Sequence, residues 1–203
     1  MSTPGVLHAL LLDGAGRARS LAWADVQAWT PDQGLLWLDL DYHTPEVMTW
    51  QTSSSNVDPI TISALTDSDP RPRAAVQGEN LLLVLHGINN NAGAEPEDMI
   101  SVRAWVEPRR IITLRHRHST TVQSLATGLE RGTGPRAAGD FTLLLVEGWS
   151  STSSHVSTCS AMTSRPARTV RSQATMPTCA QLSPITAAAR SHCAASSRRS
   201  ARR

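Results

Sequence analysis

A chain of 203 residues is long enough for one domain of ordinary size, or for one domain followed by a tail. Its net charge of +2 hides an asymmetry: residues 1–147 hold all 17 acidic residues and 11 of the 19 arginines, a net charge of −6, while the remainder holds eight arginines and no acid. No stretch approaches 18 consecutive apolar residues and the amino terminus lacks a basic signal-peptide start, so we expect a cytoplasmic chain with no membrane-spanning helix.

Two strands and a short helix are predicted near the amino terminus. Residues 6–12 form an apolar run of strand length, and Asp-Gly-Ala-Gly at 13–16 predicts a hairpin turn. Such a glycine pair can also cradle a phosphate, but the third glycine and the following helix of that motif are missing, which favours the plain turn. Residues 21–29 predict a short helix, and LLWLDL at 35–40 predicts the next strand.

Two further helices are predicted to begin with proline in their first turn. Thr44 and Asp58 each precede a proline and offer a side-chain oxygen as a helix cap. The sequence DPRPR at 69–73 must be extended, because each proline excludes the α conformation of the residue before it. It is predicted to lead into a strand at 74–77.

Three strands between residues 80 and 117 organise the rest of the domain. The unbroken apolar run LLLVL at 81–85 predicts a central strand covered on both faces. At 100–106 apolar and polar residues alternate, which predicts a strand with one buried face. A tight turn at 107–110 contains proline, so we expect 100–114 to be an antiparallel hairpin.

The clearest amphipathic helix follows the hairpin. Thr120 and Gln123 have the spacing of a capping box, and apolar side chains recur every three or four residues from 122 to 129. Gly132 is predicted to end this helix. Asp140 is predicted to cap another helix, whose apolar pattern soon fades.

The composition changes abruptly after residue 147. Residues 148–203 are dominated by Ser, Thr, Ala, Arg and Pro without apolar periodicity, so we expect a disordered tail. Its arginines favour nonspecific attraction to phosphate over specific nucleic-acid binding, because no aromatic side chain follows Trp149 to stack on a base. The three cysteines, all in this tail, lack the paired spacing of a zinc site.

The tail also suggests a change of reading frame. All 19 basic residues of the chain are arginine, which is typical of a GC-rich gene, and a shifted frame in such a gene yields runs of Arg, Ser, Ala, Pro and Thr. We therefore hypothesise that a frameshift replaced a longer carboxy-terminal part. Translation of the coding DNA in its other frames past codon 147 tests this hypothesis.

Two groups of polar side chains leave predicted strands at alternating positions. Asp39, Asp41 and His43 share a face if the LLWLDL strand stays extended, and His116 and His118 do so after the RIITL strand. Carboxylates and imidazoles in such a pattern are candidate ligands for zinc or a hard cation. The alternative, which we favour for both groups, is the solvated end of a strand, where polar side chains are ordinary. For His116 and His118, the interleaved arginines also repel a cation.

The sequence does not support an enzyme. It contains no GxSxG elbow, Walker loop, HExxH motif or EF-hand pattern. His86 follows a predicted buried strand and is expected to be a satisfied core or edge histidine rather than a catalyst. No catalytic residue and no cofactor is therefore expected.

Six short segments resemble, in order, the amino-terminal cytoplasmic domain of CorA-type divalent cation transporters, and the ZntB-like zinc transporter branch looks most similar. They are 34–39 (GLLWLD), 71–73 (RPR), 85–89 (LHGIN), 96–99 (PEDM), 110–115 (RIITLR) and 132–135 (GTGP). The resemblance covers residues 6–147. It departs at His86, where this branch is expected to have arginine.

The resemblance implies an α/β fold in which a mixed β-sheet lies between helical layers (α/β/α), followed here by the disordered tail. In the family this domain leads into a stalk helix, two membrane helices and a Gly-Met-Asn loop at the pore of a homopentamer, and the sequence contains neither that loop nor the membrane helices. Residues 1–147 are thus expected to be a cytoplasmic funnel or regulatory domain for Zn²⁺ or Mg²⁺. Residues 148–203 stand in place of the stalk and membrane helices, so we expect no transport by this chain alone and a monomer or weak oligomer.

Under this resemblance the five polar candidates become candidate regulatory metal contacts. They are Asp39, Asp41, His43, His116 and His118. Two alternatives stay open: a free-standing soluble metal-binding or regulatory module, and a metal-dependent hydrolase built on the first three of these residues.

Overall fold

The computed structural model describes residues 3–161, apart from residues 69–70, 90, 92 and 96–98. Its sheet has seven strands in the order β2-β1-β3-β7-β6-β5-β4, and within the described residues only β3 and β7 run parallel. The strands are β1 (Val6–Leu12), β2 (Ala18–Ser20), β3 (Leu35–Asp41), β4 (Arg73–Gln77), β5 (Asn80–Ile88), β6 (Met99–Val106) and β7 (Arg110–Arg115). The helices are α1 (Trp23–Gln27), the 3-10 helix η1 (Pro31–Gln33), α2 (Pro45–Ser53), α3 (Pro59–Thr66), α4 (Thr120–Arg131) and α5 (Ala138–Ala161).

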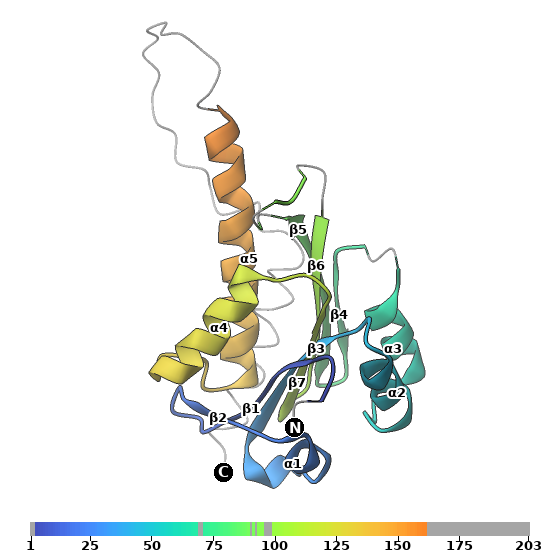
Figure 1. The fold of residues 1–203 in the computed structure, drawn as a ribbon. Coiled ribbons are helices and arrows are strands. Elements are labelled where there is room, and N and C mark those ends of the chain that lie inside the picture. The colour runs from blue at the N-terminus through green and yellow to red at the C-terminus, as the bar shows by residue number, and fades with distance from the viewer. Residues whose placement is uncertain (1–2, 69–70, 90, 92, 96–98, 162–203) are drawn as a thin grey trace, which may run out of the picture.

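The sheet lies between two helical layers, which confirms the predicted α/β/α arrangement. Helices α4 and α5 cover one face, and α1, α2 and α3 lie on the other (Figure 1). Strand β3 shows why both faces need a cover: Leu35 and Trp37 pack with the α4–α5 layer, whereas Leu36 and Leu38 pack with the other layer. A strand whose successive residues are all large and apolar is buried on both faces.

The predicted hairpin, the predicted turn at 13–16 and the predicted central strand are also confirmed. β6 and β7 form the antiparallel hairpin, β1 and β2 pair antiparallel across the turn at 13–16, and β5 is buried on both faces between β4 and β6. The three-residue strand β2 was not predicted, because it is too short to show a pattern.

The prediction of a single buried face for β6 was wrong. Arg103 and Trp105, on the face expected to meet solvent, are only 1% and 3% exposed. The layer containing α3 covers this face, and the polar groups find partners there: Arg103 Nη1 donates to the Leu65 carbonyl at 2.7 Å, and Trp105 Nε1 donates to Glu107 Oε1 at 2.9 Å. The sequence of β6 alternates between apolar and polar residues, yet both faces of the strand are buried.

The helix starts follow the predicted chemistry with three differences, one of which is that Asp140 lies in the first turn of α5 and does not precede the helix as its cap. Asp58 caps α3 by accepting hydrogen bonds from the amides of Ile60 and Thr61, but the Thr44 side chain makes no capping bond to α2. The cap of α4 is Ser119 rather than Thr120, since the Ser119 hydroxyl accepts from the Val122 amide at 3.4 Å. The residue at the cap must be extended, and Ser119 has φ of −125° while Thr120 already lies in the helix.

Helix α5 is longer than its apolar pattern suggested. It continues past residue 147 to Ala161, and Trp149 is buried in the core. The division of the chain at 147 stays a prediction, although α5 crosses that point without a break. Residues 162–203, most of the predicted disordered tail, lie outside the described residues.

Candidate functional site

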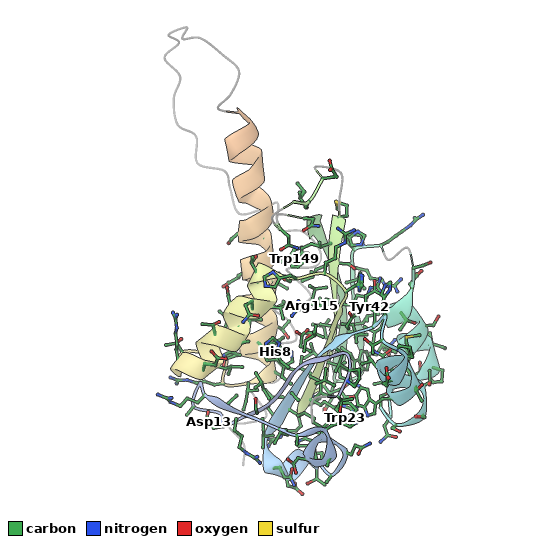
Figure 2. All side chains as sticks on the ribbon, viewed as in Figure 1. His8, Asp13, Trp23, Tyr42, Arg115 and Trp149 are labelled. Atoms are coloured by element: carbon green, nitrogen blue, oxygen red, sulfur yellow. The ribbon has the colours of Figure 1, made fainter. Side chains whose placement is uncertain are left out.

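The carboxyl ends of the parallel strands β3 and β7 meet at one edge of the sheet. In register, Asp39 lies beside Thr113 and Asp41 lies beside Arg115. Figure 2 shows Tyr42 and Arg115 near this end of the sheet. Ligands of α/β sheets commonly bind outside the carboxyl ends of strands, so this edge is the natural candidate site.

Asp39 is the centre of a buried network and has no exposed surface. Its Oδ2 accepts hydrogen bonds from Arg115 Nη2 at 2.8 Å and from Arg115 Nε at 3.0 Å, and it lies 3.0 Å from His8 Nδ1. Its Oδ1 accepts from the Thr113 hydroxyl at 2.8 Å, and that hydroxyl accepts from Trp37 Nε1 at 3.0 Å. Three strands, β1, β3 and β7, are thereby joined through one carboxylate.

These contacts give Asp39 a structural role. Both of its oxygens are engaged, and a buried ion pair is favourable only when its remaining lone pairs are also satisfied. Arg115 is itself 5% exposed, so either partner alone would leave a buried, unpaired charge. The network fixes how the two parallel strands align beneath the site.

The remaining polar side chains of this edge form a partly exposed cluster. His43 and His116 stack face to face, with ring centroids 4.0 Å apart and an interplanar angle of 23°. Asp41 Oδ1 lies 3.3 Å from His116 Nδ1 and accepts the His43 backbone amide at 2.9 Å. The Tyr42 ring lies against both imidazoles, at 4.5 Å from His43 and 6.5 Å from His116.

His118 lies apart from this cluster. Its Nδ1 is 3.3 Å from Asn91 Oδ1, and its backbone carbonyl accepts from Asn91 Nδ2 at 3.0 Å. The alternation of His116 and His118 did not translate into a shared site, because β7 ends at Arg115 and the chain turns there.

The five predicted metal ligands thus occupy three places: the buried network, the stacked cluster and the contact with Asn91. Within the part of the chain that the structure describes, no three His, Cys, Asp or Glu side chains are grouped to hold a metal ion. Stacked imidazoles direct their nitrogen lone pairs along nearly parallel planes, so two rings at 23° do not converge on one ion without rotating. The metal site accordingly stays a prediction.

Sequence reasoning missed Arg103 as a neighbour of this edge. The Arg103 guanidinium carbon lies 4.2 Å from the centroid of the Tyr42 ring, and its Nη2 is 3.4 Å from the Tyr42 hydroxyl. Burial lowers the pKa of Arg103 from its ordinary value, because a low dielectric disfavours the cation. One signal was present in the sequence, an arginine within a predicted strand. The alternation of apolar and polar residues at 100–106, however, predicted that this arginine pointed to solvent.

No helix among the described residues has the length and apolar character needed to cross a bilayer.

The comparisons with known proteins agree with this fold. The family model described as CorA-like Mg²⁺ transporter protein matches residues 32–158. The chain is 35% identical over 144 residues to the divalent cation transporter CmaX of Pseudomonas aeruginosa, and 31% identical over 143 residues to the zinc transport protein ZntB of Pectobacterium atrosepticum. Each alignment covers 70% of this chain and 43% of the relative.

Solved structures give the same result. Full-length CmaX matches with a TM-score of 0.74 at 30% identity, covering 79% of this chain and 50% of that chain. The ZntB cytoplasmic domain from Vibrio parahaemolyticus matches with a TM-score of 0.64 at 21% identity, covering 79% of this chain and 64% of that domain chain. The fold is therefore that of the cytoplasmic domains of CorA-type transporters.

The chain belongs to the family of CorA-like Mg²⁺ transporter proteins, and within it is ZntB-like. It spans less than half the length of the curated relatives it matches. Those relatives are transporters of divalent cations and not enzymes, which agrees with the prediction drawn from the sequence.

Proposed function

We propose that the described domain is the cytoplasmic funnel and regulatory domain of a ZntB-like transporter of divalent cations. The observation that carries the proposal is the match with full-length CmaX, which extends over 79% of this chain and half of that structure. The excess of acidic residues, 17 against 11 arginines up to residue 147, supports it, because a negative field raises the local concentration of cations.

A chimera tests this proposal. Residues 1–161 of this chain replace the matching amino-terminal part of CmaX, and uptake of Zn²⁺ and Mg²⁺ is measured in membrane vesicles against CmaX itself and against CmaX lacking that part. We expect the chimera to restore uptake that the shortened CmaX has lost. A chimera present in the membrane in normal amount but without uptake would contradict the proposal.

We further propose that the ion concerned is Zn²⁺ or Mg²⁺ and that, of the five predicted ligands, Asp41, His43 and His116 form the contact once the two imidazoles have rotated out of their stacked arrangement. Their mutual proximity and partial exposure support this part of the set. Calorimetric titration of the full chain with each metal, before and after substitution of all three by alanine, tests it. Micromolar binding lost on substitution supports the contact, and absence of binding to the unchanged chain refutes it.

The same titration addresses the alternative, a free-standing metal-binding or regulatory module. That alternative requires metal binding by the chain together with a chimera that does not transport. We also propose that the described domain by itself does not transport and is a monomer or weak oligomer, since both of its hydrophobic clusters are covered by its own helices and need no second copy. Light scattering that gave a stable pentamer would refute the second part.

A further inference from the structure

Trp149 attaches helix α5 to the sheet close to the point where the helix leaves the domain. Trp149 is 8% exposed, and its Nε1 donates a hydrogen bond to the backbone carbonyl of His86 at 3.0 Å, near the end of β5. This contact joins residues 63 apart in the sequence. The indole is therefore held both by packing and by a directed bond.

The Trp149 indole packs against Gly87 of β5. A Cβ atom at this position would lie 3.1 Å from Trp149 Cζ2 and 3.2 Å from Cε2 and Nε1, closer than nearly all real contacts of this kind. The next strand residue, Ile88, is already partly exposed at the end of β5. A side chain at Gly87 would therefore require the indole to move by a few tenths of an ångström from its place beside the His86 carbonyl.

The residue before Trp149 fixes α5 in a second direction. A Cβ at Gly148 would lie 2.7 Å from Thr121 Cγ2, so α5 and α4 approach closely there. Two consecutive residues of α5 therefore contact two different elements, α4 and β5. These two contacts extend to the edge of the domain the packing that Phe141 and Leu145 make in the earlier turns of α5.

The two residues that follow Trp149 differ from it in burial. Ser150 and Ser151 are exposed, and their hydroxyls donate to the carbonyls of Val146 and Glu147 at 2.8 and 2.9 Å. Hydroxyls bonded to carbonyls one turn back favour bending of a helix. The remaining turns, up to Ala161, project past the end of the sheet (Figures 1 and 2).

We infer that Trp149, seated on Gly87, is the positioning residue that sets the direction in which α5 leaves the domain. The inference rests on the proposed function, because only in a transporter does this direction orient a following part of the protein. Trp149 then acts as the pivot at which a displacement of β5 is passed to α5. The contact transmits orientation and takes no part in binding the cation.

Amide hydrogen exchange of the full chain, followed by mass spectrometry, tests the pivot. Trp149→Phe keeps the ring but removes the bond to His86, and Gly87→Ala keeps the bond donor but displaces the ring. In both variants we expect peptides from 150–161 to exchange about fivefold faster, the factor that corresponds to the loss of one hydrogen bond. Peptides from α4 and from the β6–β7 hairpin should keep their original rates.

Two matched controls isolate the effect. Trp105→Phe also removes an indole hydrogen bond, to Glu107 Oε1 at 2.9 Å, but on the opposite face of the sheet. Gly128→Ala adds a methyl group in α4, where its nearest neighbour, the Gly134 Cα, lies at an ordinary 3.5 Å. Neither control should change exchange in 150–161.

Three results would overturn the inference. The first is unprotected exchange of 150–161 in the original chain, which would mean that nothing holds the segment. The second is unchanged exchange there in both variants, and the third is an equal rise across the whole domain, which would mean ordinary destabilisation. If the chimera transports but exchange in 150–161 does not change as expected, only the pivot is refuted. If exchange changes as expected but the chimera does not transport, only the proposed transport function is refuted.

Discussion

Asp39 and Asp41 lie two residues apart on the same face of one strand, yet their surroundings differ. Asp39 is fully buried and bonded to Arg115, whereas Asp41 is partly exposed beside His116. A buried charge that loses its partner has no solvent to compensate it, while an exposed pair is worth little. The same residue type in the same pattern therefore has two roles, and depth in the sheet decides which.

Asp39→Ala is expected to lower the free energy of unfolding by about 3–5 kcal/mol, because Arg115 would stay buried without its partner. Asp41→Ala is expected to cost no more than about 0.5 kcal/mol. Urea denaturation of both variants measures the difference. The double variant Asp39→Asn with Arg115→Met should be less destabilised than the sum of its single changes, and strict additivity would contradict the assigned ion pair.

Asp13 gives the β1–β2 turn a defined dependence on pH. Its carboxylate Oδ1 accepts the amides of Ala15 at 2.7 Å and Arg17 at 3.0 Å, and these backbone hydrogen bonds, the Ala15 bond first, lower the pKa of Asp13 below its ordinary value. A lowered pKa in the folded state stabilises the fold above the ordinary value of 3.8, and this contribution is lost as pH falls through the lowered pKa.

Asp13→Asn should therefore destabilise the domain at neutral pH and lose this effect in acid. Denaturation of the original chain and the variant, at a series of pH values from neutral down to below the ordinary pKa of aspartate, measures the gap between them. We expect the gap to close toward the acid end. A gap independent of pH would show that the carboxylate charge contributes nothing to the turn.

At the scale of the elements, the point where a helix begins or ends depends on a single capping residue. The pattern of buried side chains along the helix does not identify that residue. Ser119 is 2% exposed and accepts from the Val122 amide, whereas Thr120 is exposed. At the other end, α4 stops at Gly132, which has the left-handed conformation expected for a helix end. The amphipathic pattern predicted the body of α4, and local backbone conformation chose its cap.

Ser119→Ala is expected to cost about 1 kcal/mol of unfolding free energy, the typical value for a lost cap. Thr120→Ala, one position along, should change stability by less than about 0.5 kcal/mol. Chemical denaturation of the two variants side by side distinguishes them. Equal losses, or a larger loss at Thr120, would mean that the cap has been assigned to the wrong residue.

For the molecule as a whole, the described residues form two hydrophobic cores. All buried members of the two clusters lie between Ala9 and Trp149, on the two sides of one sheet. Stability of a two-layered core depends on the apolar area that its own elements bury. We therefore expect the fold to be independent of residues 162–203.

A chain that ends at Ala161 should unfold within about 2 °C of the full chain in differential scanning calorimetry, which corresponds to less than about 0.5 kcal/mol for a domain of this size. The ending at Ala161 keeps the whole of α5 and both of its contacts. A fall in Tm of several degrees would mean that the tail contributes to the core and would contradict the proposed division of the chain.

Local pattern was enough to predict most of the strands and α4. Unbroken apolar runs predicted β1, β3 and β5, the proline turn predicted the β6–β7 hairpin, and 3.6-residue periodicity predicted α4. These features depend on neighbours within a few positions, where side-chain spacing and turn chemistry act directly. The family resemblance then supplied the layered fold, which the structure and the comparisons confirm.

Only the tertiary structure decided which polar residues are structural. The parallel pairing of β3 with β7 joins Asp39 to Arg115, which are 76 residues apart. The layer containing α3 buries Arg103, although the alternating sequence of β6 predicted one solvent-exposed face. Trp149 likewise belongs to the core because its indole packs against Gly87 of β5 and donates a hydrogen bond to the His86 carbonyl. Burial is a property of the assembled layers, and a local sequence does not specify which distant element will cover it.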